Sequence, residues 1–257
     1  MEYDLKNFND VPKILDYLKE KPFNSRKSVL SALYIISGNP KYKIRMLDDI
    51  SEYNQEVNLQ TKNQKQIDAD VPEEEMNKIF DHLKKSAGLI YKNGNITVDG
   101  QQQIQNYLML CLLSGKYLPP RRSLDYACMK IRNVDKDKDN YIEKGWFIFN
   151  VYKTAKFYGQ QKLKIPPALR PILNKWISVD TSDYLLHDSK NQPLNAITLN
   201  QRFEKIFGRK VGVNGLRHMY LSTKYQKTIE LNDAMNQDLK DMGSSSAQSK
   251  VYVKRDD

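Results

Sequence analysis

The stretch WFIFNVYKTAKFYGQQKLKI, residues 146–165, decides the fold class of this chain. Its first seven residues are mostly aromatic or β-branched. Its last four alternate lysine with leucine and isoleucine, which is typical of a strand with one buried face. Pro166 and Pro167 then end the pattern. The stretch therefore predicts two antiparallel strands joined by a turn.

Apolar residues on both sides of this stretch recur at helical spacing. The predicted helices cover about residues 11–18, 25–37, 42–60, 72–83, 100–114, 168–177, 198–207, 214–225 and 231–242. Residues 62–70 have no apolar periodicity, so they predict a linker between a domain of residues 1–65 and a domain of residues 66–257. The expected fold is mainly α with a small antiparallel β-sheet (α+β).

The charge balance indicates a polyanionic partner. The 257 residues carry a formal charge of +10, with a pI near 9.3. Nucleic acid and an anionic membrane face are both candidates, and a solvated basic surface is the alternative. No apolar run reaches the length of about 18 residues that a membrane helix needs.

Other residue counts disfavour several classes of protein. Cys111 and Cys128 lie in apolar segments, so we expect two buried free thiols in a reducing compartment. Three histidines and the absence of a glycine-rich loop disfavour a His/Cys metal centre and a P-loop ATPase.

Four scattered segments carry groups suited to phosphate chemistry. They are PPRRSLD (119–125), VYKTAK (151–156), NGLRH (214–218) and DMGSSS (241–246), the last followed by Tyr252. Each segment alone is more often a solvated or structural feature. The ordered set of arginine, hairpin lysine, Leu-Arg-His, Gly-Ser-Ser and tyrosine is much harder to obtain by chance.

With these residues in order, nearly the whole chain resembles the tyrosine recombinase/integrase family. The Pro-Pro-Arg-Arg and Tyr-Lys-Thr motifs are most similar to those of the branch found in eukaryotic large DNA viruses, virophages and related mobile elements. The resemblance implies a helical core-binding domain followed by a catalytic domain. It also implies a site-specific recombinase that cleaves and rejoins double-stranded DNA through a 3′-phosphotyrosyl intermediate. Such an enzyme acts as a homo-tetramer on paired DNA sites, with no cofactor, metal or membrane. The expected location is intracellular: the nucleus or a viral replication compartment, or otherwise the cytoplasm or nucleoid.

The resemblance also assigns roles to single residues. Tyr252 would attack phosphorus, Arg122 and Arg217 would bind the non-bridging oxygens, and Lys153 would protonate the leaving 5′-oxygen. Arg122 is preferred to Arg121 because an acid, Asp125, follows it three residues later, as in the family. Asp125 and His218 are expected to support the site rather than react.

Two positions depart from the family pattern. Asn214 stands where the family usually has histidine. Ser244 stands where it usually has histidine or tryptophan. Both side chains can donate a hydrogen bond to a phosphate, but neither can carry a proton as imidazole does. Losing acid–base help costs roughly 10²–10⁴-fold in rate. Two alternatives therefore stay open: a type IB topoisomerase-like nicking–closing enzyme, and a non-catalytic DNA-binding derivative of the fold.

Further residues are candidates for contact with the DNA. Residues 145–170 contain lysines and an arginine but no acid, which suits a DNA backbone. The helix predicted over residues 198–207 carries side chains suited to base edges. The candidates are Arg26, Lys27, Lys156, Lys162, Lys164, Asn200, Arg202 and Lys205.

Overall fold

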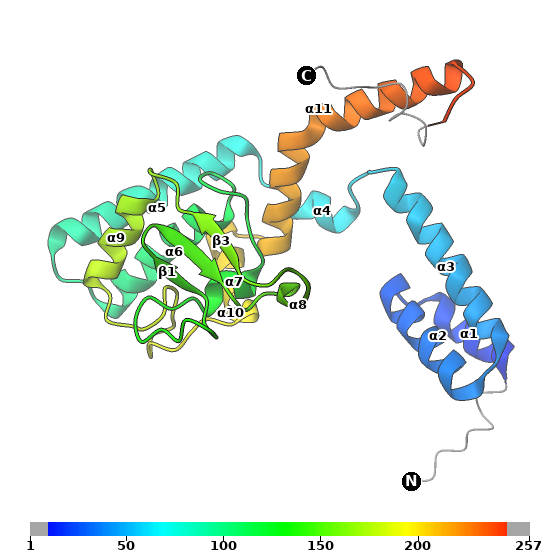
Figure 1. The fold of residues 1–257 in the computed structure, drawn as a ribbon, viewed down its shortest axis with the longest axis horizontal. Coiled ribbons are helices and arrows are strands. Elements are labelled where there is room, and N and C mark those ends of the chain that lie inside the picture. Colours follow the sequence, from blue (N-terminus) through cyan, green and yellow to red (C-terminus); the bar gives the residue numbers. More distant parts are fainter. Residues whose placement is uncertain (1–9, 246–257) are drawn as a thin grey trace, which may run out of the picture. The chain divides into compact units, whose positions relative to one another are not determined.

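The computed structural model describes residues 10–245. The chain divides into two compact units, Met1–Asn63 and Gln64–Asp257. Most of the described residues are helical, and they include a three-stranded antiparallel sheet (Figure 1). The predicted fold class, mainly α with a small antiparallel sheet, is confirmed.

The first unit is a cluster of three helices, α1 (Val11–Lys19), α2 (Phe23–Ser37) and α3 (Pro40–Asn58). Gly38 ends α2 in the left-handed conformation, and Asn39 caps α3 by accepting from the backbone N–H of Lys41. The N-cap of α2 is Pro22, so the helix begins two residues before its predicted start. The core comprises Val11, Leu18, Leu30, Leu33 and Tyr42.

A buried carboxylate joins α2 and α3 within this unit. Asp49 is fully buried and pairs with Arg26 at 2.5 Å and with Arg45 at 2.6 Å. Arg26 also donates to the backbone oxygen of Lys19 at the end of α1. Burying a carboxylate is costly unless cations and hydrogen bonds compensate for the lost water. The two arginines therefore serve the fold of the unit.

We expect Asp49→Ala to destabilise this unit, because it leaves the half-buried Arg26 without its counter-charge. Breaking a buried pair costs about 3–5 kcal/mol. Hydrogen exchange of the whole chain should show faster exchange of the α1–α3 amides. Asp48→Ala, which removes the exposed neighbouring acid, is the control. Equal protection in both variants would contradict a structural role for the pair.

The second unit begins with α4 (Gln64–Asp68), which lies in the stretch predicted to be a linker. Two longer helices follow, α5 (Glu73–Asn93) and α6 (Val98–Leu113). The acids in the first turn of α5 face the positive end of the helix dipole. Residues 107–113 of α6 are all buried, so α6 forms the middle of the core.

The sheet has the order β1-β2-β3, with β1 (Tyr141–Glu143), β2 (Trp146–Phe149) and β3 (Gln161–Lys164). The pairing of β2 with β3 confirms the predicted hairpin. Strand β1 was not predicted. Phe147 and Phe149 point into the core, where both rings pack edge-on against Tyr126 of α7 (Ser123–Ala127). These contacts join the sheet to the helix that follows the PPRR segment.

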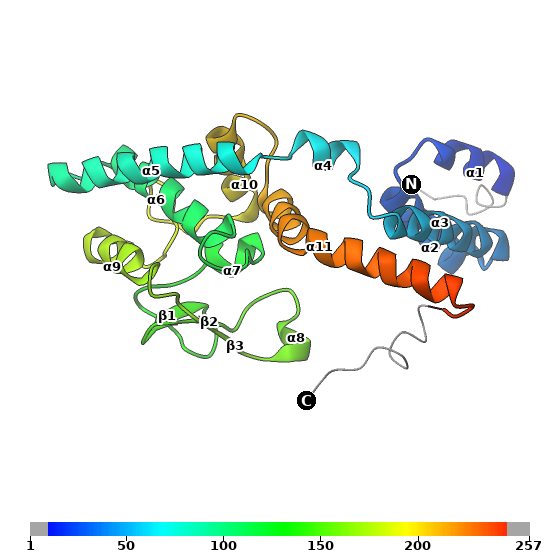
Figure 2. The same ribbon diagram turned by 90° about the horizontal axis from the view of Figure 1, so that it is seen from above.

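Three helices complete the unit: α9 (Arg170–Val179), α10 (Ala196–Phe207) and α11 (Val213–Asp241). Figures 1 and 2 show α11 as one long helix. The prediction of two separate helices over this region is therefore wrong. Residues 226–230, QKTIE, contain no glycine or proline to interrupt the helix. No helix in residues 10–245 combines the length and apolarity needed to cross a bilayer.

A buried histidine lies in the polypeptide between α9 and α10. The Nδ1 of His187 lies 2.8 Å from the Asp188 backbone oxygen, and its Nε2 lies 3.0 Å from a carboxylate oxygen of Asp180. Burial lowers the pKa of His187, but the hydrogen bonds to Asp180 and to the Asp188 oxygen raise it more, so the net shift is upward. Acceptors at both nitrogens favour the protonated ring over the neutral one, compared with a free imidazole.

The stability of the second unit should therefore depend on pH. A raised pKa in the folded state gives a contribution that is fully present below 6.5, the unfolded value, and is lost as pH rises through the folded pKa. The loss amounts to at most about 1.4 kcal/mol per pH unit. Urea unfolding followed by tryptophan fluorescence should show it, because Trp176 stacks on His187. His187→Gln should flatten the profile, whereas exposed His82→Gln should not. An unchanged slope in His187→Gln would contradict the assignment.

Candidate active site

The PPRR segment places Arg122 at the start of α7. Arg122 is the N-cap residue, with extended backbone angles, and the helix begins at Ser123. The two prolines precede the helix. Arg122 is half-buried. In the described part of the chain its guanidinium has no hydrogen bond or ion pair.

The loop between β2 and β3 carries Lys153, and a single buried amide positions it. Asn140 donates to the backbone oxygens of Asp125 (3.0 Å) and Val151 (2.8 Å). It also accepts from the backbone N–H groups of Asn150 and Val151, each at 2.8 Å. Four hydrogen bonds from one side chain thus connect α7 with the loop. Asn140 was not among the predicted site residues, and its only signal in the sequence is its place just before a strand.

The first turns of α11 carry Asn214 and Arg217, as the NGLRH segment predicted. The side-chain oxygen of Asn200 in α10 accepts from the backbone N–H of Val213 at 3.1 Å. A Cβ at Gly212 would lie 2.9 Å from that oxygen, so this close approach suits glycine. The contact fixes the start of α11 against α10.

These elements bring four of the predicted site residues to two adjoining cavities. The larger, about 760 Å³, is lined by Arg122, Lys153 and Asn214 among others. The smaller, about 300 Å³, is lined by Arg122 and Arg217. Both cavities share Arg122, Asp125 and Tyr152. We call the region around Arg122, Lys153, Asn214 and Arg217 the cationic cleft.

The cationic cleft carries positive charge with little compensation from the protein. Within residues 10–245, the side chains of Lys153, Asn214 and Arg217 also have no hydrogen bond or ion pair. Asp125 is the buried acid beside them. Burial raises its pKa, and the charges of Arg121, Arg122 and Arg217 oppose that rise. Donors that lack partners around an open cavity are suited to bind an anion with several oxygens.

Arg121, not Arg122, is the partner of Asp125. Its Nε lies 2.7 Å from the carboxylate, and its Nη1 donates to the side chain of Gln161 in β3. Its guanidinium also stacks over the Phe149 ring at 3.9 Å. Asp125 was expected to support the helix that carries Arg122. The structure pairs its carboxylate with Arg121, and the supporting role stays a prediction. This pairing occupies Arg121 and leaves Arg122 facing the cavities.

The remaining site candidates are His218 on α11, Ser244 after that helix, and Tyr252. Ser244 follows that helix, and its backbone N–H donates to the oxygen of Leu239. His218 is exposed on α11. Tyr252 lies outside the described residues, so its predicted role stays a prediction. Cys128 is exposed and lines the larger cavity, so the expectation that both thiols are buried is wrong for this one.

The predicted DNA-contacting residues divide into two groups. Lys27, Lys156, Lys162, Lys164 and Lys205 are exposed. Arg26, Asn200 and Arg202 instead make contacts within the fold. Arg202 donates to the backbone oxygen of His187 and to the side chain of Gln105. Base or phosphate contacts by these three stay predictions, and their internal hydrogen bonds argue against them.

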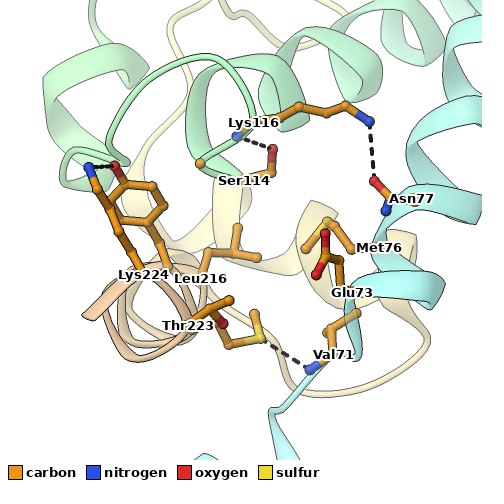
Figure 3. Close-up of a pocket in the computed structure, with 12 residues that line it drawn as sticks. Val71, Glu73, Met76, Asn77, Ser114, Lys116, Leu216, Thr223 and Lys224 are labelled. Carbon is orange, nitrogen blue, oxygen red and sulfur yellow. Dashed lines mark hydrogen bonds between the residues drawn. The ribbon is translucent and has the colours of Figure 1, made fainter. Parts of the chain in front are cut away.

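A separate cavity of about 390 Å³ lies between the start of α5, the end of α6 and α11 (Figure 3). Met76, Leu216 and Met219 give it an apolar lining, and the backbone N–H of Val71 donates to the Met219 sulfur. None of the predicted catalytic residues lines this cavity. Among residues 10–245, no group of three or more His, Cys, Asp or Glu side chains is placed to hold a metal ion.

Comparisons with known proteins give weak likenesses in structure alone. No family model matches the sequence, and no curated protein matches it. Two crystal structures of the XerH site-specific recombinase bound to difH substrates give TM-scores of 0.41 and 0.40, at 19% and 20% identity over 62% and 73% of this chain. A lambda integrase dimer bound to a COC′ core site gives 0.39, at 14% identity over 89% of this chain and 66% of that one. The chain spans less than half of the XerH chains, 43% and 49%.

We expect Asn140→Ala to release the loop that carries Lys153. Leaving a buried polar group without its partner costs about 1–3 kcal/mol, and this change removes four hydrogen bonds. Hydrogen exchange should therefore speed up first in residues 150–160. Asn174→Ala, at an exposed position of α9, is the matched control. Exchange that stays unchanged in the loop would show that other contacts hold it.

Proposed function

We propose that this chain is a DNA strand transferase of the tyrosine recombinase type. The observation that carries the proposal is the cationic cleft, where Arg122, Lys153 and Arg217 come from three distant segments to adjoining cavities. A phosphodiester resists attack because it is negatively charged and has a poor alkoxide leaving group. Guanidinium groups on its non-bridging oxygens would stabilise the charge of the pentacoordinate transition state.

In the proposed reaction, the Tyr252 oxygen forms a bond to phosphorus while the bond from phosphorus to the 5′-oxygen breaks. Lys153 gives a proton to the departing 5′-oxygen, and the product is a 3′-phosphotyrosyl link with a free 5′-hydroxyl. The reverse attack by a 5′-hydroxyl rejoins the strand. Site-specific recombination on paired sites by a tetramer, and an origin in a virus or mobile element, are part of the same proposal.

Two other functions are compatible with parts of the chain. A nicking–closing enzyme of the type IB topoisomerase kind would use the same cationic cleft without strand exchange. A DNA-binding derivative without catalysis is favoured by Asn214, an amide at a position where the family usually has an imidazole. Retention of the cations in the cleft favours catalysis.

Nicked suicide substrates test the chemistry. Incubation with a pool of nicked duplexes should give a covalent protein–DNA adduct that survives denaturation. Tyr252→Phe should abolish the adduct. Arg122→Ala and Arg217→Ala should each slow its formation by about 10²–10³-fold, because each removes a donor to the developing charge. Lys92→Ala, which removes an exposed lysine at the end of α5, is the control.

The outcomes separate the three functions. An adduct that persists in Tyr252→Phe would refute the nucleophile assignment. If no substrate in the pool gives an adduct but the duplexes bind, the non-catalytic derivative is correct. Relaxation of supercoiled DNA without exchange of strands between duplexes would identify the nicking–closing enzyme.

A further inference from the structure

The loop between β2 and β3 presents two exposed aromatic side chains. Phe157 is 82% exposed and Tyr158 is 70% exposed, both in the single helical turn α8 (Ala155–Tyr158). We call this pair the aromatic tip. Leaving a phenylalanine in water forgoes about 2 kcal/mol of burial free energy. The aromatic tip therefore marks a surface on which a partner would gain by covering the rings.

Hydrogen bonds hold the loop in one conformation. The Tyr152 hydroxyl donates to the Gly159 backbone oxygen at 2.8 Å and closes the loop. Gln160 donates to Asn150 at 2.8 Å across its base. Gly159 has φ +64° and ψ −158°, a region that only glycine enters readily. Because these hydrogen bonds already order the loop, a partner that binds the aromatic tip would lose little free energy in ordering it.

The surroundings of the aromatic tip are cationic. Lys153 and Lys156 lie on the same loop and are exposed, and residues 144–170 contain no acid. An apolar protein partner would have to bury these charges without compensation. A polyanion with flat apolar faces would satisfy both the charges and the rings. Nucleic acid has this combination, with phosphates outside and stacked bases inside.

The position of Tyr158 links the aromatic tip to the cationic cleft. Tyr158 lines the smaller cavity together with Arg122 and Arg217. A phosphodiester bound by these arginines would therefore place its neighbouring bases beside α8. An anionic membrane also offers phosphodiesters and an apolar interior, but its acyl chains have no flat faces on which an aromatic ring could stack.

We propose that Phe157 enters the base stack of duplex DNA next to the phosphate held in the cationic cleft. Lys156 would contact a flanking phosphate, and the inserted ring would unstack one base step. This inference rests on the proposed function for its DNA partner, but it concerns DNA deformation and not cleavage. Removing an aromatic side chain that stacks on a base weakens binding by about 5- to 150-fold.

The test uses the full chain and short duplexes that carry 2-aminopurine, which brightens when it unstacks. The unmodified protein should raise the fluorescence on binding. Phe157→Ala should bind about tenfold more weakly and leave the fluorescence low. The affinity of Phe157→Ala should depend on salt as that of the unmodified protein does, because no charge is lost. Lys156→Ala should instead lower the salt slope by about one and keep the fluorescence rise. Leu89→Ala, an exposed apolar position on α5, is the control.

Each result decides a different statement. DNA binding with equal affinity and equal fluorescence in Phe157→Ala would overturn the inference and leave the proposed function standing. No DNA binding by the unmodified protein would refute the proposed function, and the inference with it. Phe157-dependent binding to phosphatidylserine vesicles, without any fluorescence change on DNA, would assign the aromatic tip to a membrane and overturn the inference.

Discussion

The buried amide of Asn140 is the constraint on which the geometry of the cationic cleft depends. It binds the backbone oxygen of Asp125 in α7 and both backbone groups of Val151 at the start of the loop that carries Lys153. A buried side chain with four backbone partners has one productive orientation, since any other orientation loses some of these hydrogen bonds. The helix after Arg122 and the loop with Lys153 therefore keep their relative positions before any ligand arrives.

The same arrangement explains how the fold tolerates a concentration of like charge. Arg121 neutralises Asp125 and stacks on Phe149, so one arginine of the PPRR segment serves the core. Arg122 and Arg217 then face open cavities, where water screens their repulsion. An anion that displaced this water would meet fixed cations in a less polar surrounding, where each interaction is stronger. A cleft of this kind favours a phosphate held by several donors over a single surface contact.

Apolar periodicity in the sequence was sufficient to predict most helices and strands, but it was insufficient to predict the contacts of the site. Helices α1, α5 and α6 and the β2–β3 hairpin follow directly from apolar spacing, because one face of each meets a core. Strand β1 has only three residues, too few to show an alternation. The pairing of Arg121 with Asp125 could not be predicted, because both Arg121 and Arg122 lie at a helical spacing that allows an ion pair with Asp125. The side-chain rotamers decide between them. Asn200 and Arg202 were predicted to contact DNA, but their side chains bind backbone groups elsewhere in the fold. Such hydrogen bonds leave no pattern in the local sequence.

The amide at Asn214 changes what the cationic cleft must do if it acts on DNA. An amide can donate a hydrogen bond to a phosphate oxygen, but it cannot accept the proton that an attacking phenol has to lose. That proton must therefore leave to water, and the reaction gains from any field that favours the phenolate. Cations within about 4–6 Å of a tyrosine favour its charged form. The cations of Arg122, Lys153 and Arg217, which have no ion pair within residues 10–245, would supply such a field to a tyrosine brought among them, as the proposed reaction requires.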